Sequence, residues 1–177
     1  MFDRFLVRAD SLRNDVRDSA VVGFSMAVRH ANYRGCYLSL HNGYYVEVDG
    51  VTYPTHSQTF EVNGQPPRTF EQTRTAVWEH WDYDDEAILH IAAPGGLAPG
   101  KHTLRFQQSV LAAYGYAPTD QDWVEHPPTP GTGAGSDKTP QILTYTLTLN
   151  DDPVVPCDDT RDAAADRQLV RPGGKES

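Results

Sequence analysis

The chain has 177 residues, with 15 Lys and Arg against 24 Asp and Glu, and its formal net charge is −9 at pH 7. This acidic balance disfavours binding to nucleic acid and to anionic membranes, and no run of residues approaches the roughly 18 apolar residues of a membrane span. The length fits about one domain, and the 13 Pro, 14 Gly and nine Tyr favour strands and turns over helices.

The N-terminal stretch MFDRFLVRADSLRND carries charges through its first turns and lacks the apolar core of a secretory signal. Two cysteines are present, Cys36 in an expected strand and Cys157 in a polar tail. We therefore expect reduced thiols and a cytoplasmic location.

Five short strands are predicted in the first half of the chain by alternating apolar residues between Gly, Pro, Asn and Asp clusters. They cover residues 22–28, 36–40, 57–63, 74–81 and 86–92. Between the second and third of these lies VEVDGVTY, residues 46–53, in which Asp49 and Gly50 separate two apolar runs. An Asp-Gly pair in this context predicts a two-residue β-hairpin turn.

The second half contains two further strands. Alternation over residues 103–114 is too long for an average strand, so we expect a bend or bulge within it. The last strand covers residues 142–149, with Leu143, Tyr145, Leu147 and Leu149 on one face. Eight or nine strands without a convincing helix indicate an all-β fold, a two-sheet antiparallel β-sandwich that resembles a jelly roll.

Two segments fall outside this pattern. Residues 117–140 form a long loop rich in Pro and Gly, which contains the lone Trp123. Residues 151–177 form a polar C-terminal tail with room for one short helix. We therefore expect a sandwich domain over residues 1–150 and a separate tail over residues 151–177.

A metal site is the first chemical hypothesis, because seven histidines are present. A cupin-like site needs converging His and carboxylate ligands, but the chain contains no His-x-His pair. Glu79 and His80 would meet His90 across a hairpin whose turn is residues 82–85. Such a pair supplies two histidine ligands where a site needs three, so surface or hydrogen-bonded histidines are the favoured interpretation.

Two other motifs have simpler interpretations. GFSMA, residues 23–27, imitates a nucleophile elbow, but Ser25 falls in the middle of a strand rather than on a strand-to-helix turn. DYDDE, residues 82–86, resembles part of a calcium loop but lacks the EF-hand spacing, and we interpret it as a solvated acidic turn.

Aromatic residues offer a second hypothesis, a sugar-stacking platform made by Trp78, Trp81 and Tyr83. Trp78 and Trp81 are an odd number of residues apart, so on one flat strand they point to opposite faces. One of the two is then expected in the core. A stand-alone carbohydrate-binding module remains open as an alternative.

Four co-linear blocks give the chain its resemblance to a known family. They are MFDRFLVRADSLRN, GFSMAVRHANYRGCYLSL, VEVDG and PGGLAPGKHTLRFQQSVLAAYGY. In order and spacing, from Met1 to about Leu149, they resemble the small β subunit of bacterial C-glycoside deglycosidases. The loop and the tail depart from that pattern.

The resemblance implies a non-catalytic β-sandwich subunit that stabilises a TIM-barrel catalytic α subunit in a higher-order hetero-oligomer. In that family the large subunit carries a divalent metal of the Mn type and an acid–base histidine. The complex cleaves the carbon–carbon bond between a 3-oxo sugar and a flavonoid-type aglycone. We therefore expect no catalytic residue, cofactor site or metal site in this chain.

Such a subunit needs an apolar surface for its partner, and aromatic residues are the preferred anchors of such surfaces. Trp123 is the preferred anchor because its loop offers little local core for it to join. The candidates are Phe2, Phe5, Tyr33, Tyr114, Tyr116 and Trp123.

Overall fold

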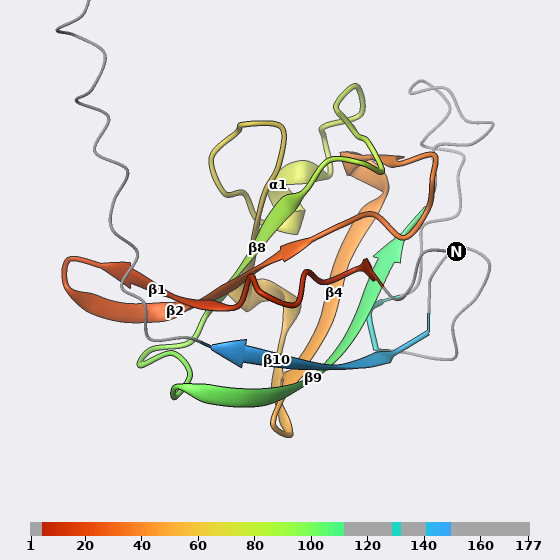
Figure 1. The fold of residues 1–177 in the computed structure, drawn as a ribbon. Coiled ribbons are helices and arrows are strands. Elements are labelled where there is room, and N and C mark those ends of the chain that lie inside the picture. The colour runs from red at the N-terminus through yellow and green to blue at the C-terminus, as the bar shows by residue number, and fades with distance from the viewer. Residues whose placement is uncertain (1–4, 112–128, 132–140, 150–177) are drawn as a thin grey trace, which may run out of the picture.

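The computed structural model describes residues 5–111, 129–131 and 141–149, and about half of these residues lie in antiparallel strands (Figure 1). Two four-stranded sheets form the layers of a β-sandwich, and a two-stranded sheet closes one end. The all-β sandwich expected from the alternation is confirmed. The jelly-roll connectivity remains an expectation.

The first sheet has the order β1-β2-β8-β6, and all its neighbouring strands run antiparallel. Phe24, Met26 and Leu89 are buried on its inner face. Its strands are β1 (Arg13–Arg17), β2 (Ala20–Val28), β8 (Ala87–Ala92) and β6 (Gln58–Glu61).

The second sheet has the order β10-β9-β4-β5 and packs its inner face against the first. Its strands are β10 (Leu143–Leu149), β9 (Gly100–Val110), β4 (His41–Val48) and β5 (Val51–Tyr53). The predicted hairpin is confirmed as β4-β5, with Asp49 and Gly50 at φ of 50° and 83°, the left-handed pair that a tight turn requires.

A bend or bulge was expected within residues 103–114, and an irregularity lies on the strand that pairs with β9. His41 pairs with Val110 and Tyr44 pairs with Gln108, so two residues of β4 face a single residue of β9. This bulge on β4 bends the sheet where β9 turns toward the closed end of the sandwich. The distal part of the predicted strand, from residue 112, lies outside the described residues.

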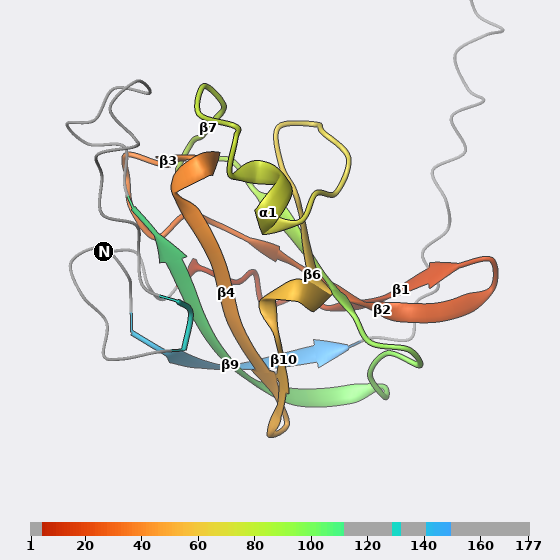
Figure 2. The ribbon, with the colours of Figure 1, turned by 180° about the vertical axis from the view of Figure 1, so that it is seen from behind.

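The closed end is formed by β3 (Cys36–Tyr37) and β7 (His80–Trp81), which pair with each other (Figure 2). Three short helical segments complete the described fold. They are the 3-10 turns η2 (Leu38–Leu40) and η3 (Thr55–Ser57) and the single-turn helix α1 (Phe70–Thr73). No helix among the described residues is long and apolar enough to span a membrane.

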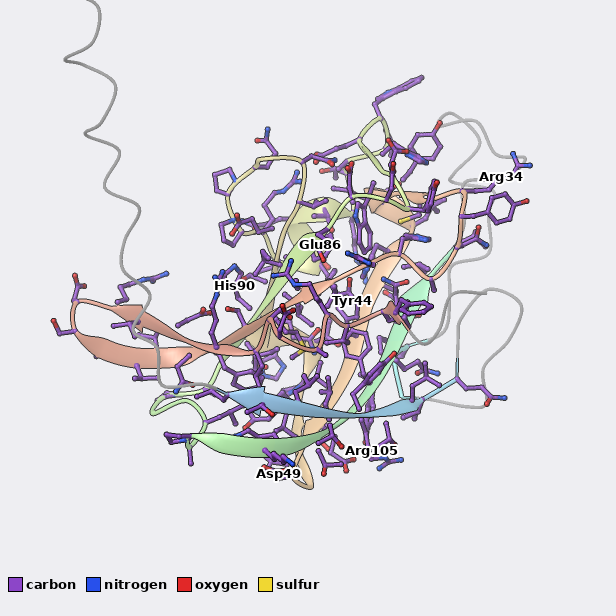
Figure 3. The ribbon with its side chains drawn as sticks, in the orientation of Figure 1. Arg34, Tyr44, Asp49, Glu86, His90 and Arg105 are labelled. Atoms are coloured by element: carbon purple, nitrogen blue, oxygen red, sulfur yellow. The ribbon has the colours of Figure 1, made fainter. Side chains whose placement is uncertain are left out.

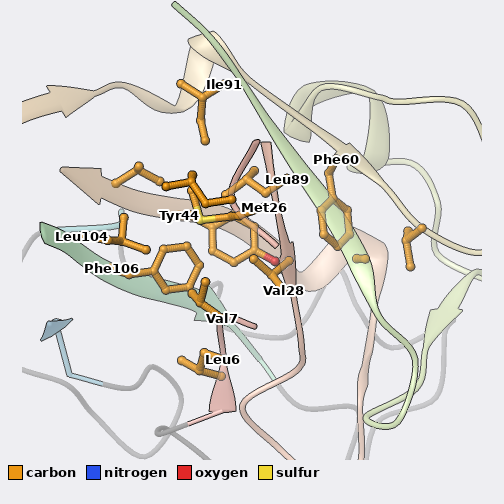
Figure 4. Packing of buried hydrophobic residues seen from close by; sticks show 14 of the residues in the cluster. Leu6, Val7, Met26, Val28, Tyr44, Phe60, Leu89, Ile91, Leu104 and Phe106 are labelled. Atoms are coloured by element: carbon orange, nitrogen blue, oxygen red, sulfur yellow. The ribbon is translucent and has the colours of Figure 1, made fainter. Parts of the chain in front are cut away.

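The core lies between the inner faces of the two sheets (Figure 4). The rings of Tyr44 and Phe106 stack with centroids 4.9 Å apart at its centre, and Phe60 meets the buried Trp81 edge to face at 5.1 Å. Aromatic pairs of this kind add about 0.5–1.5 kcal/mol beyond the burial of their surface. The core therefore extends from the space between the two four-stranded sheets to the β3-β7 sheet at the closed end.

The strand predicted over residues 74–81 is wrong, and only its last two residues form β7. Residues 74–79 form turns instead, in which the Ala76 N–H donates to the Thr73 carbonyl (2.9 Å) and the Glu79 N–H donates to the Ala76 carbonyl (3.3 Å). They follow the helical turn α1, which begins with a capping box: the Gln72 N–H donates to Thr69 Oγ1 (3.2 Å), and the Thr69 N–H donates to Gln72 Oε1 (2.8 Å). Buried Phe70 anchors this turn to the core. The strand predicted over residues 36–40 likewise ends at Tyr37 and continues as η2.

Candidate functional site

The proposed meeting of His80 and His90 across a hairpin is wrong, because β7 pairs with β3 and β8 pairs with β2 and β6. His80 Nδ1 contacts Asp82 (2.8 Å), whereas His90 lies between the carboxylates of Asp15 and Glu61. Within the described parts of the chain, no three His, Cys, Asp or Glu side chains are placed to hold a metal ion.

His90 belongs instead to a polar ladder that crosses all four strands of the first sheet, on the face turned away from the core. Its Nδ1 lies 2.8 Å from Asp15 Oδ2, and its Nε2 lies 3.2 Å from Glu61 Oε2. The fully buried Ser25 donates its hydroxyl to Asp15 Oδ1 (2.6 Å). The ladder therefore joins β1, β2, β8 and β6 by side chains as well as by backbone.

The two carboxylates favour the charged form of His90. Burial opposes this charge, but the hydrogen bonds and charges of Asp15 and Glu61 outweigh it and raise the pKa of His90. Burial also opposes the charge of Asp15, yet its bonds to His90 and Ser25 lower its pKa. Because both ring nitrogens of His90 face carboxylates, this imidazole is not free to accept a proton from a substrate.

Ser25 has no nucleophile geometry. It lies in the middle of β2, as its place in the alternation predicted, and it donates to a carboxylate rather than to an imidazole. A serine nucleophile must also reach its substrate, and the Ser25 side chain is fully buried. The elbow-like motif is therefore structural.

A groove of about 810 Å³ lies beside the ladder, with Arg13, Arg17, Gly23, His90 and Ala92 among its lining residues. Its size suits a ligand or a segment of another chain. Among the described residues, its lining contains no Phe, Tyr or Trp, the side chains that sugar stacking needs.

One of Trp78 and Trp81 lies in the core, as expected, although Trp78 lies in a turn and not on the opposite face of a strand. Trp81 is fully buried in the core, where it contacts His30 and Phe60, and its Nε1 donates to the Asp85 carbonyl (3.1 Å). Trp78 is 71% exposed and Tyr83 is 49% exposed. A three-ring platform is therefore wrong, because only Trp78 and Tyr83 are available at the surface.

Two of the six predicted interface residues are described, and both are at the surface: Phe5 is 65% exposed and Tyr33 is 58% exposed. The other four, Phe2, Tyr114, Tyr116 and Trp123, lie outside the described residues. Trp78 and Tyr83 were not included in that prediction. No strand periodicity marks Trp78 as exposed, because it lies in a turn that precedes β7.

A cavity of about 320 Å³ lies at the closed end of the sandwich and is lined by Phe5, Arg29, His30, Tyr83 and Asp84. His30 is buried beneath it, and burial lowers its pKa to about 4, so the ring is neutral at pH 7. The cavity thus combines two aromatic rings with an arginine and a carboxylate at its rim. Such a mixture is typical of protein interfaces.

Comparison with known proteins gives two matches. The chain matches the family described as C-glycoside deglycosidase beta subunit over residues 2–114, which is more than half of its 177 residues. It is 31% identical over 94 residues to the C-glycoside deglycosidase beta subunit of Eubacterium cellulosolvens. That alignment covers 53% of this chain and 63% of the relative, so the chain spans less than two thirds of the relative's length.

Proposed function

Because this chain belongs to the family of C-glycoside deglycosidase beta subunits, we propose that it is the non-catalytic subunit of a heteromeric C-glycoside deglycosidase. Its partner is a TIM-barrel catalytic subunit that binds a divalent metal. The complex cleaves the carbon–carbon bond between a 3-oxo sugar and an aromatic, flavonoid-type aglycone. The observation that carries this proposal is the family match over residues 2–114.

The proposed reaction explains why acid–base chemistry is needed. A C-glycosidic bond has no leaving oxygen to protonate, so the two-carboxylate scheme of glycoside hydrolysis does not apply. A ketone at C3 acidifies the proton on C2, and loss of that proton permits elimination of the aglycone. A metal near the ketone stabilises the negative charge that develops there.

The roles of the described histidines support placing this chemistry on the partner. His90 bridges two carboxylates, and His102 lies between Asp49 (2.6 Å) and the Ala98 carbonyl (2.7 Å). His41 is buried and stacks on Phe70 at 4.9 Å. These side chains stabilise the sandwich, which suits a scaffold subunit. We place the complex in the cytoplasm, where its thiols stay reduced.

Co-expression tests the proposal. The chain is produced together with its proposed TIM-barrel partner, which is sought among the neighbouring genes, and the mixture is resolved by size-exclusion chromatography and assayed on a 3-oxo C-glycoside. We expect one co-eluting complex that releases the aglycone, and no turnover by this chain alone. Turnover by the isolated chain, or separate elution of the two proteins, would contradict the proposal.

The exposed Trp78 and Tyr83 keep a carbohydrate-binding module as the second candidate. Retention of the isolated chain on immobilised glycans, abolished by Trp78→Ala, would favour it. Trp81→Ala is unsuitable for this test because Trp81 is in the core and its removal would unfold the protein rather than report on sugar binding.

A further inference from the structure

Four exposed aromatic side chains stand around the short β3-β7 sheet, and we call this surface the aromatic end: Phe5, Tyr33, Trp78 and Tyr83. Phe5 and Tyr83 line the same cavity. Tyr33 precedes β3 and Trp78 precedes β7 by only a few residues, and these two strands are paired (Figure 2). Exposed aromatic residues gathered in this way mark interaction sites more often than isolated ones do.

Buried groups hold this surface in place from below. Trp81 packs edge to face on His30 at 5.0 Å and donates to the Asp85 carbonyl, so it fixes the turn that carries Tyr83. Gln108 on β9 accepts from the Ala31 N–H (2.8 Å) and donates to the Arg29 carbonyl (3.2 Å). A surface that is already ordered loses less conformational entropy when a partner binds.

Tyr33 and Arg34 form an ordered pair at the edge of the aromatic end. Arg34 Nε donates to Tyr33 Oη (3.2 Å), and the guanidinium carbon lies 5.2 Å from the centre of the Tyr33 ring. Tyr and Arg are enriched among the residues that dominate binding energy at interfaces. Arg34 lies far from His90 and the groove beside it (Figure 3).

Two carboxylates at this end, Asp84 and Asp85, have no ion pair among the described residues, and Asp84 is the one that lines the cavity. Glu86 binds both Arg8 (2.6 Å) and Arg29 (3.1 Å), and Asp82 binds His80. A partner that covers the cavity must supply a basic group near Asp84, because burying an unpaired carboxylate is costly.

The groove on the first sheet lacks these features. Its carboxylate Asp15 is already paired with His90, and its lining is polar or aliphatic. The exposed apolar residues nearest to it are Val16 and Val22. It therefore offers no aromatic anchor for a partner.

We infer that the aromatic end is the surface on which the catalytic subunit docks, with an apolar side chain of that subunit in the cavity between Phe5 and Tyr83 and a basic side chain against Asp84. This inference rests on the proposed function, because it names the contact surface for the partner assigned there. The anchors are Tyr83 and Trp78, and Asp84 supplies the charge that selects a basic patch.

The test measures binding of the separately purified TIM-barrel subunit proposed above to the full chain by isothermal titration calorimetry. Trp78→Ser combined with Tyr83→Ser should weaken binding at least tenfold. Asp84→Asn should weaken it about threefold to tenfold and reduce its dependence on salt. All three side chains are exposed, so unchanged thermal melts are expected to show that the variants fold.

Matched controls lie on other surfaces. Val16→Ser with Val51→Ser removes two exposed apolar side chains from β1 and β5, and Thr52→Lys raises the net charge by the same single unit as Asp84→Asn. These changes should leave the affinity unchanged. If the Trp78 and Tyr83 double variant binds with wild-type affinity, the inferred docking surface is wrong. The same holds if the Val16 and Val51 double variant loses binding. Neither result would contradict the proposed function. Absence of binding by the wild-type chain would overturn both.

Discussion

At the scale of single residues, the side chains of two fully buried glutamines join segments that have no backbone hydrogen bonds to each other in the sheets. Gln58 on β6 donates to the carbonyls of Tyr44 (2.9 Å) and Tyr53 (3.1 Å), and so joins the first sheet to the second. Gln108 on β9 holds the segment that follows β2. Each glutamine side chain supplies the hydrogen-bond partner of backbone groups that would otherwise be buried without one.

Gln108→Leu tests this role. The change leaves the Ala31 N–H and the Arg29 carbonyl without their partner, so the free energy of unfolding should fall by about 2–3 kcal/mol. Urea denaturation measures the loss, and Gln65→Leu, at an exposed position, should change it by less than about 0.5 kcal/mol. Equal effects of the two changes would show that the Gln108 bonds do not stabilise the fold.

The polar ladder predicts a pH dependence whose sign follows from its pKa shifts. The pKa of His90 is raised above its ordinary value near 6.5, so its contribution to stability is complete below that pH and disappears as the pH rises through the raised value. The pKa of Asp15 is lowered, so its contribution holds above its ordinary value near 3.8 and disappears in stronger acid. The ladder therefore stabilises most between these limits.

His90→Gln isolates this contribution, because glutamine keeps hydrogen bonding but does not titrate. At pH 5.5 the variant should be less stable than the wild type by about 1–2 kcal/mol, and at pH 9 the difference should shrink toward zero. Urea denaturation measures the free energy of unfolding of both proteins at the two pH values. His102 is present in both proteins, so its titration does not affect the difference between them. A difference that is the same at both pH values would contradict the charged form of His90.

At the scale of elements, local sequence patterns correctly predicted the strands and turns whose formation depends only on neighbouring residues. The Asp49-Gly50 turn and the alternation of β10 depend only on neighbouring residues, and both are confirmed. β1 was missed because RNDVR has no apolar alternation and forms a strand only by pairing with β2. β7 was overextended because residues 74–79 form turns whose N–H groups bond to nearby carbonyls rather than to a neighbouring strand, and strand propensity alone does not reveal this.

The candidate site shows the same division. Phe5 was chosen as an interface candidate because aromatic residues anchor interfaces, and it is exposed. One of Trp78 and Trp81 was expected in the core, and Trp81 is buried, but Trp78 lies in a turn rather than on the opposite face of a strand. The ladder of Asp15, His90 and Glu61 was not predictable, because it depends on the order of strands distant in sequence. The cavity at the aromatic end likewise requires the β3-β7 pairing, which no local pattern indicates.

Two glycines in the sheets give a contrast that tests the elements directly. Gly23 lies in regular β2, but a Cβ there would sit 2.0 Å from the Ile91 carbonyl oxygen of β8. Gly50 has open space around it but a φ of 83°. Gly50→Ala should cost about 1–2 kcal/mol through the left-handed conformation alone, whereas Gly23→Ala should cost about 3 kcal/mol because two backbones must separate. Thermal denaturation ranks the two variants, and the reverse order would contradict the packing of β2 on β8.

At the scale of the whole molecule, the described part of the chain forms a continuous core that ends with β10. The buried cluster runs from Leu6 to Leu149 and includes both sheets and the closed end. Leu147 and Leu149 are its last members, and they pair with His102 and Gly100 of β9. The aromatic end and the polar ladder are therefore displayed on one folding unit, which must form as a whole before either surface exists.

Truncation defines where that unit ends. A chain that stops at Leu149 keeps every residue of the described core, so its melting temperature should lie within about 2 °C of that of the full chain. A chain that stops at Leu143 loses two buried leucines worth about 3–6 kcal/mol and uncovers β9, so its melting temperature should fall by about 10 °C or more. Calorimetry compares the three proteins. If the first truncation is as damaging as the second, residues beyond 149 belong to the folding unit, and the boundary expected at residue 150 must move toward the C-terminus.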